Sequence, residues 1–191
     1  MTEYILDCEF VPGNPLLPIS LALVQVAPVP PPSGGGNCCY NPPCNRDRQW
    51  ADWERTGGVR SLYVEWPNAK ELAVSNDWLK ANVLPGLTGQ TTQDIPARIR
   101  ELLGPKGDYE LLASYGAYDF FLLSETLGGF ASSGLPYTYR EMAHMNLPRV
   151  ERQGEKDHNA LDDCLLLRRA LLESRRPGGN REERGRNEYQ Q

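Results

Sequence analysis

Residues 4–10 read YILDCEF and decide how the rest of the chain is interpreted. The apolar residues around two acids predict a β-strand, and side chains alternate between the two faces of a strand. Asp7 and Glu9 therefore point to one side, and the apolar side chains point to the other. Two neighbouring carboxylates repel each other and favour a shared proton or a cation. The pair is thus either a metal platform or the solvated face of an edge strand, and the stretch alone leaves both open.

Composition narrows the class of protein. The chain has 191 residues and a net charge of −5. This length suffices for one domain with a core, and the charge argues against a globally basic nucleic-acid coat. It does not exclude nucleic acid, because bound cations would offset a carboxylate site. No signal peptide or membrane span is expected, and five cysteines cannot form a complete disulfide set. We therefore expect a soluble cytoplasmic protein.

The order of elements predicts an α/β domain. A turn at 11–15 separates the first strand from ISLALVQV (19–26), so an antiparallel hairpin is expected. Ser20 then lies near the two acids, most simply as a satisfied buried hydroxyl. Further strands are predicted at RSLYVEW (60–66) and ELLAS (110–114). Helices are predicted over 78–84, 94–103, 120–127, 138–145 and from about 158 to 174, with caps at 75–77 and Asp94.

Two segments differ in composition from this domain. An insertion over about 28–58 is rich in proline, glycine and cysteine, with tryptophans and arginines behind them. Its three cysteines match no familiar zinc spacing, and its tryptophans either contact single-stranded nucleic acid or fold the insertion back. The tail over 175–191 has almost no apolar residue and is predicted to be disordered. The domain itself is expected to span 1–174.

Further acids follow in the order that a metal site needs. Asp119 begins a helix after the fourth strand, and Asp163 lies in the last helix, with His158 at its start. Alone, Asp119 is explained as a helix N-terminal acid. Together with the first pair, four carboxylates can hold two divalent cations about 4 Å apart, and oxygen ligands suit magnesium or manganese. A histidine near neutrality can accept the proton of an attacking water. The other histidine, His144, is read as structural.

These motifs resemble those of the DEDDh group of 3′-to-5′ exonucleases. Asp7-Cys8-Glu9 matches the first motif, YGAYD (115–119) is similar to the second, and HNALDD (158–163) matches the third, which selects Asp163 over Asp162. With Asn82-Val83-Leu84-Pro85, the sequence looks most like the RNase AS family of polyadenylate-preferring exoribonucleases. The resemblance runs from Tyr4 to about Leu172, without the insertion and the tail.

The resemblance implies an RNase H-like fold: a central mixed sheet of three antiparallel and then parallel strands, flanked by helices. It implies two Mg²⁺ or Mn²⁺ ions held by Asp7, Glu9, Asp119 and Asp163, with His158 as general base.

Substrate contacts are implied at Phe10, Tyr115 and Tyr118. Phe10 either touches the terminal nucleotide or packs in the core. Tyr115 stands where many related enzymes have asparagine, so it either stacks on a base or packs. The family also makes a homodimer an arrangement to test.

The expected function is a metal-dependent 3′-to-5′ exoribonuclease that releases nucleoside monophosphates from single-stranded RNA by two-metal-ion hydrolysis. The alternatives are a DNA exonuclease of the same superfamily and, less favoured, a non-catalytic nucleic-acid-binding protein. The sequence does not separate RNA from DNA, because the contacts to a 2′-hydroxyl cannot be placed.

Overall fold

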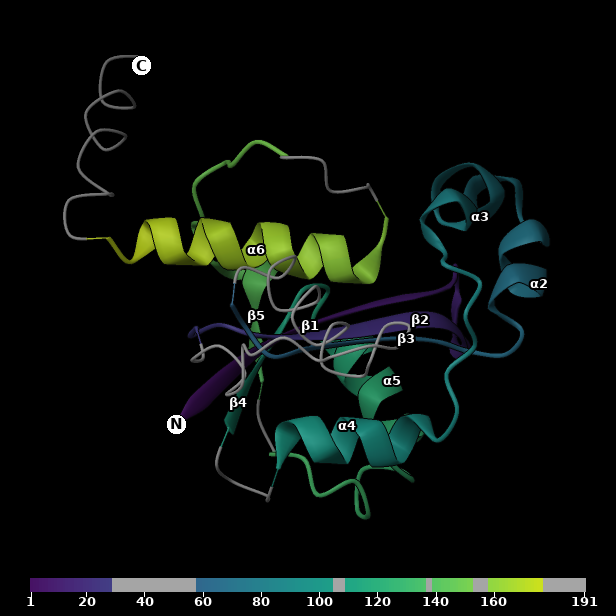
Figure 1. The fold of residues 1–191 in the computed structure, drawn as a ribbon, viewed down its shortest axis with the longest axis horizontal. Helices are drawn as coiled ribbons and strands as arrows, with labels where there is room; N and C mark the ends of the chain where they lie inside the picture. Colours follow the sequence, from purple (N-terminus) through teal and green to yellow (C-terminus); the bar gives the residue numbers. More distant parts are fainter. Residues whose placement is uncertain (29–57, 105–108, 137–138, 153–157, 177–191) are drawn as a thin grey trace, which may run out of the picture.

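The computed structural model describes residues 1–28, 58–104, 109–136, 139–152 and 158–176. Its centre is a five-stranded mixed sheet in the order β3-β2-β1-β4-β5 (Figure 1). The strands are β1 (Thr2–Val11), β2 (Asn14–Gln25), β3 (Ser61–Glu65), β4 (Tyr109–Ala113) and β5 (Arg140–Glu141). β1, β2 and β3 pair antiparallel, whereas β4 pairs parallel with β1 and β5 with β4. A mixed α/β sheet flanked by helices, as expected, is confirmed.

Helices cover both faces of this sheet. They are α2 (Ala69–Val74), α3 (Asp77–Asn82), α4 (Ile95–Leu103), α5 (Ala117–Thr126) and α6 (Ala160–Ser174), with the 3₁₀ turns η1 (Leu84–Gly86) and η2 (Met142–His144). In Figure 1, α6 lies above the sheet, α4 and α5 lie below it, and α2 and α3 stand beyond one end. The first turn of α6 points towards that same end.

The register of the hairpin decides which side chains meet α6. Asp7 is paired with Ala22, and Glu9 with Ser20, which is paired in turn with Glu65. Directly paired residues share a face of the sheet. Ile5, Ala22 and Val24 form a buried cluster with side chains of α6, so the two acids of β1 lie on the α6 side. The alternate side chains of β1 pack with α4 and α5 instead.

The strand pattern differs from the expected one at the fifth strand. A helix was predicted over 138–145, but Arg140 and Glu141 pair with β4, and η2 follows directly. Met142 is 2% exposed and belongs to the buried cluster under α6. Ladder bonds to β4 and burial of this one side chain therefore override the local helical pattern.

Smaller differences concern the helix ends. A cap was predicted within residues 75–77, and Asn76 caps α3 by accepting from the backbone N–H groups of Trp78 and Leu79. Asp94 occupies the N-cap position of α4 but makes no side-chain cap, and its φ is +51°. The expected helix over 78–84 ends as α3 and continues as η1, and α2 was not predicted.

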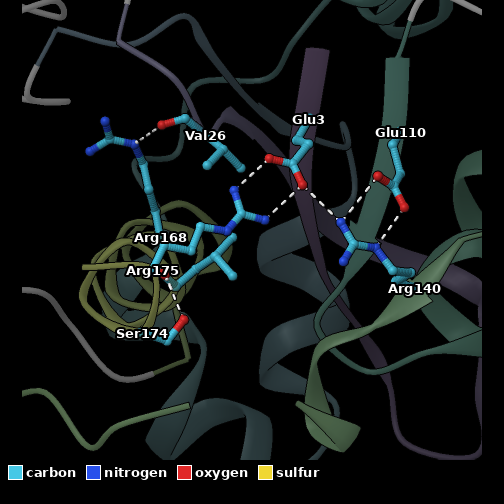
Figure 2. A network of polar contacts seen from close by, with 8 residues as sticks. Glu3, Val26, Glu110, Arg140, Arg168, Ser174 and Arg175 are labelled. Atoms are coloured by element: carbon cyan, nitrogen blue, oxygen red, sulfur yellow. Dashed lines mark hydrogen bonds and ion pairs between the residues drawn. The ribbon is translucent and has the colours of Figure 1, made fainter. Parts of the chain in front are cut away.

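The start of β1 is held by a network of ion pairs (Figure 2). Glu3 accepts from Arg140 Nη2 at 2.8 Å and from Arg175 Nη1 at 2.6 Å, and Arg140 Nε donates to Glu110 at 2.6 Å. Arg168 Nε donates to the carbonyl of Val26 at 2.8 Å. The hydrogen bond from Arg175 is the main cause that lowers the pKa of Glu3, although burial opposes it. The network ties the end of α6 to the start of β1.

Other expectations fall partly or wholly outside the described residues. Residues 29–57, which make up nearly all of the insertion, and residues 177–191 of the tail are among those not described. Arg175, where the tail was expected to begin, is the residue that pairs with Glu3. Among the helices that the structure describes, none is long and apolar enough to cross a bilayer.

Candidate metal centre

Three predicted ligands converge above the middle of the sheet. One carboxylate oxygen from each of Asp7, Glu9 and Asp163 lies within 4.8 Å of the other two. Asp7 is only 8% exposed. The residues paired with the two β1 acids are Ala22 and Ser20, whose small side chains leave room for the carboxylates under α6. Alternation along β1 and the start of α6 thus bring together acids that are more than 150 residues apart in sequence.

The third acid is oriented by the first turn of α6. Asn159 is the N-cap: its side chain accepts from Asp162 N at 3.1 Å, and its carbonyl accepts from Asp163 N at 2.9 Å. Capping groups of this kind satisfy the free N–H groups of a helix start. Asp163 therefore projects from a fixed first turn rather than from a loop.

Asp119 lies close to these acids but outside the group of three. It is fully buried in the first turn of α5, and its Oδ2 accepts from Tyr115 N at 2.6 Å. Its backbone carbonyl lies 3.9 Å from the Sγ of Cys8, which follows Asp7 on β1. Among the described residues, no group donates to Asp119 Oδ1. A buried carboxylate oxygen without a partner is costly, and a cation would satisfy it.

The electrostatics of the four acids favour a cation. Burial, followed by the charges of Asp119, Glu9 and Asp163, raises the pKa of Asp7 well above its usual range. Burial and then Asp163 and Asp119 raise the pKa of Glu9 to about 8. Burial is also the main cause that raises the pKa of Asp119. Without a counterion, Asp7 and Glu9 hold protons at neutral pH, and a divalent ion removes that requirement.

An arginine pairs with the most exposed acid of the three. Arg152 Nη2 lies 2.7 Å from Asp163 Oδ1. A guanidinium at this position competes with any other cation for the same oxygen. Arg152 was not singled out by the sequence, because nothing in its local pattern relates it to α6.

His158 sits where the sequence placed it, just before the cap of α6. Its ring packs edge-on against Trp78 of α3, with centroids 4.8 Å apart. Its φ is +54°, which is uncommon for a residue other than glycine. Within the described residues, His158 is not part of the group of acids that could hold one ion. Trp78 is 47% exposed and was missed as a site residue. Its position beside His158 results from folding and has no signal in the local sequence.

The three predicted substrate contacts form one aromatic row. The ring of Tyr118 lies 5.7 Å from that of Phe10 and 6.1 Å from that of Tyr115, on which it stacks. Tyr115 and Tyr118 are 66% and 49% exposed, whereas Phe10 is partly buried against the core. Phe10 follows Glu9 on β1, and Tyr118 precedes Asp119 on α5, so the row comes from the same two elements as three of the acids.

A fifth acid, Glu141, was also missed. Gly116 has a φ of +61°, and a Cβ built there would lie 2.5 Å from the carboxylate carbon of Glu141. The charge of Glu141 contributes to the raised pKa of Asp119. This acid was hidden because its segment was predicted as a helix rather than as β5. Gly116 is therefore needed both for its backbone conformation and for the space that Glu141 fills.

No family model matches this chain, and no curated protein matches it. The function is therefore inferred from the site itself.

Proposed function

We propose that this chain is a metal-dependent 3′-to-5′ exoribonuclease with an RNase H-like fold, which releases nucleoside monophosphates from single-stranded RNA. The observation that carries the proposal is the convergence of Asp7, Glu9 and Asp163 within 4.8 Å, together with buried Asp119, whose Oδ1 has no hydrogen-bond partner among the described residues. Four acids gathered in a partly buried place are unfavourable unless cations accompany them.

The donor set fits Mg²⁺ or Mn²⁺. All four candidate ligands are carboxylates, which these ions prefer, and the arrangement offers enough oxygens for two of them. Asp7, Glu9, Asp119 and Asp163 would hold the ions. When bound, the ions supply the positive charge that stabilises the attacking and leaving oxygens of a phosphodiester.

The other residues take the remaining roles. His158, at the start of α6, accepts the proton of the attacking water, which is the ordinary task of a histidine near neutral pH. The row of Phe10, Tyr118 and Tyr115 stacks on the bases of the strand end. Stacking on exposed aromatic rings suits a single strand, whose bases are free.

The arrangement of strands supports the RNase H-like assignment. Three antiparallel strands lie next to two parallel ones, with the acids on the central strand and on helices at both faces. Single-stranded RNA is the proposed partner, a homodimer stays a prediction, and a reducing, cytoplasmic location accords with the free thiols of Cys8 and Cys164.

The nearest alternative is the same reaction on DNA. A protein distinguishes RNA from DNA through the 2′-hydroxyl, and the proposal names no residue that would bind this group. A binding protein without catalysis is less well supported. Clustered acids repel a phosphate backbone, and a protein that only binds gains nothing from them.

The test uses end-labelled RNA and DNA of identical sequence, with Mg²⁺, with Mn²⁺ or with EDTA. We expect a metal-dependent ladder that shortens from the 3′ end, faster on RNA than on DNA. Asp163→Asn should abolish the ladder, whereas the matched control Asp162→Asn, one residue away, should retain it. A folded wild-type protein that cleaves neither strand in any metal, yet binds RNA in EDTA, would favour the binding protein.

A further inference from the structure

A second polar cluster lies on the α6 side of the sheet and is not used by the proposed function. Its members are Tyr63 and Glu65 on β3 and Asn159 at the start of α6. Glu65 is 2% exposed and Asn159 is 7% exposed. Glu65 stands in the same row of the sheet as Glu9, separated from it by Ser20. Buried polar groups are costly unless they are paired, so the contacts of this cluster need an explanation.

Glu65 holds the segment that follows η1. Its carboxylate accepts from the backbone N–H groups of Thr88 at 2.5 Å and Gly89 at 2.9 Å. It also accepts from the hydroxyl of Tyr63 at 3.0 Å. Burial and the neighbouring Glu65 raise the pKa of Tyr63, so its hydroxyl stays protonated and able to donate. The segment at 86–89 is thereby attached to β3.

Asn159 connects this segment to α6. Its Nδ2 donates to the carbonyl of Gly86 at 2.9 Å and makes a longer contact of 3.4 Å with the hydroxyl of Tyr63. Its Oδ1 caps α6 at Asp162 N. The fit at Gly86 is close, because a Cβ built there would lie 3.2 Å from the Cβ of Asn159. One side chain thus binds the η1 segment, β3 and the first turn of α6.

The residue before Asn159 is His158, and its backbone is strained. A left-handed conformation at a residue other than glycine persists only where the surroundings enforce it. Asn159 on one side and the ring of Trp78 on the other are the surroundings that the structure shows. Asp163 is one turn further along, with its N–H bonded to the Asn159 carbonyl.

We propose that Glu65, Tyr63 and Asn159 are positioning residues, which fix the turn at 158–159 and through it the directions of His158 and Asp163. The inference rests on the proposed function, since it concerns two residues that act in it. None of the three touches the proposed reacting atoms. Residues that orient a ligand from behind commonly contribute about 10- to 100-fold to activity or to metal affinity.

The first variant is Tyr63→Phe, which removes one hydroxyl and leaves Glu65 its two backbone donors. The matched control is Tyr4→Phe. Tyr4 is also buried in the sheet, and its hydroxyl donates to the Leu102 carbonyl at 3.0 Å, but it lies on the α4 side. Tyr63→Phe loses the hydrogen bond to Glu65 and the longer one from Asn159, whereas Tyr4→Phe loses the one to Leu102, so thermal melts should show small losses of stability for both.

The second variant is Asn159→Ser. Serine retains an N-cap acceptor for α6 but is too short to replace the amide donor to Gly86. If Asn159 serves only as a cap, this variant should behave like the wild type. If Asn159 positions the turn at 158–159, α6 stays intact in this variant, but the side chains of His158 and Asp163 take altered directions.

The measurements are kcat and KM on single-stranded RNA and, separately, Mn²⁺ binding by calorimetry. Tyr63→Phe and Asn159→Ser should each lower kcat by about 10- to 100-fold at nearly unchanged KM and weaken Mn²⁺ binding by about tenfold. Tyr4→Phe should change neither. If Tyr63→Phe and Tyr4→Phe give equal kcat and equal Mn²⁺ affinity, the positioning role is wrong and the exonuclease stands.

The two hypotheses can fail separately. If the wild type cleaves neither RNA nor DNA, but both α6-side variants weaken Mn²⁺ binding, the exonuclease is wrong and the positioning of Asp163 stands. A wild-type protein that neither cleaves nor binds Mn²⁺ overturns both.

Discussion

The two ends of β1 carry the same kind of side chain in opposite surroundings. At its start, Glu3 lies between Arg140 and Arg175, and its pKa is lowered mainly by Arg175. Near its end, Glu9 lies among acids, and burial with Asp163 and Asp119 raises its pKa to about 8. The acid at one end is paired with two arginines of the protein, whereas the acids gathered at the other end could hold a metal ion. The difference shows that acids in one strand can form ion pairs or gather into a candidate metal site, depending on which charged residues the neighbouring elements bring to them.

Asp7→Asn is the strongest test of the contrast between the two ends of β1. Loss of one ligand should lower the cleavage rate at least about 100-fold, as removal of one preorganised electrostatic group does in other enzymes. In EDTA the same variant should melt at a higher temperature than the wild type, because folding no longer requires a buried carboxyl with a raised pKa to take up a proton. Kinetics and thermal melts check the two parts. Lower stability in EDTA together with full activity would contradict the metal site.

The pH dependence of stability sharpens the comparison. The pKa of Glu9 is about 8 in the folded protein, against an ordinary 4.5. The folded state therefore holds a proton that the unfolded chain releases, and stability in EDTA should fall as the pH rises from about 4.5 to about 8. Glu3 behaves oppositely, because its lowered pKa makes stability fall only as the pH drops through its own lower range.

Melting temperatures between pH 5 and 8, in EDTA and in Mg²⁺, test this expectation. Saturating Mg²⁺ should remove most of the decline, since a ligand that binds only the folded state adds stability. Glu9→Gln should flatten the curve in EDTA. A curve of the wild type that rises with pH in EDTA would show that the acids are not desolvated as described.

Arg152→Gln should have a smaller effect than Asp7→Asn, and it should strengthen metal binding rather than weaken it. Arg152 pairs with Asp163 at 2.7 Å and competes there with a metal ion. A partly exposed ion pair is worth about 0–1 kcal/mol, so its removal should tighten Mn²⁺ binding by up to about fivefold. Calorimetry of the two proteins measures it. Weaker binding in the variant would mean that Arg152 supports the bound state instead.

Glu3→Gln should have the smallest effect. Its partners are about two-fifths exposed, and such pairs contribute about 0–1 kcal/mol to folding. We expect a slightly lower melting temperature, which depends less on salt concentration than that of the wild type. The Mn²⁺ affinity and the cleavage rate should be unchanged. A change in Mn²⁺ affinity would show that the two ends of β1 are coupled, contrary to the contrast drawn between them.

Much of the site could be predicted because it depends on local periodicity. Alternation along residues 4–10 correctly put Asp7 and Glu9 on one face. Asp163 was selected through the resemblance to a known motif, His followed by four residues and Asp, and the structure brings it to the other two acids. A helix cap within residues 75–77 was correctly predicted, and the structure shows that Asn76 provides it. Each of these follows from a few neighbouring residues.

The remainder depends on contacts between distant segments. The predicted helix over 138–145 is wrong because Arg140 and Glu141 pair with β4 and Met142 packs in the core. The roles of Trp78 and Glu141 likewise depend on partners from other elements. The bonds of Glu65 to Thr88 and Gly89 span more than twenty residues and have no local signature.

The register of β1 has a consequence for changes in chain length. Its alternate side chains, including Leu6 and Cys8, belong to the apolar cluster with α4 and α5. Deleting Cys8 alone would move Glu9 to the opposite face and drive a carboxylate into that cluster. Replacing one of these acids tests the proposed metal site alone, but deleting the residue between them would also damage the fold. Along this strand, the number of residues between the acids is therefore fixed by the fold as well as by the site.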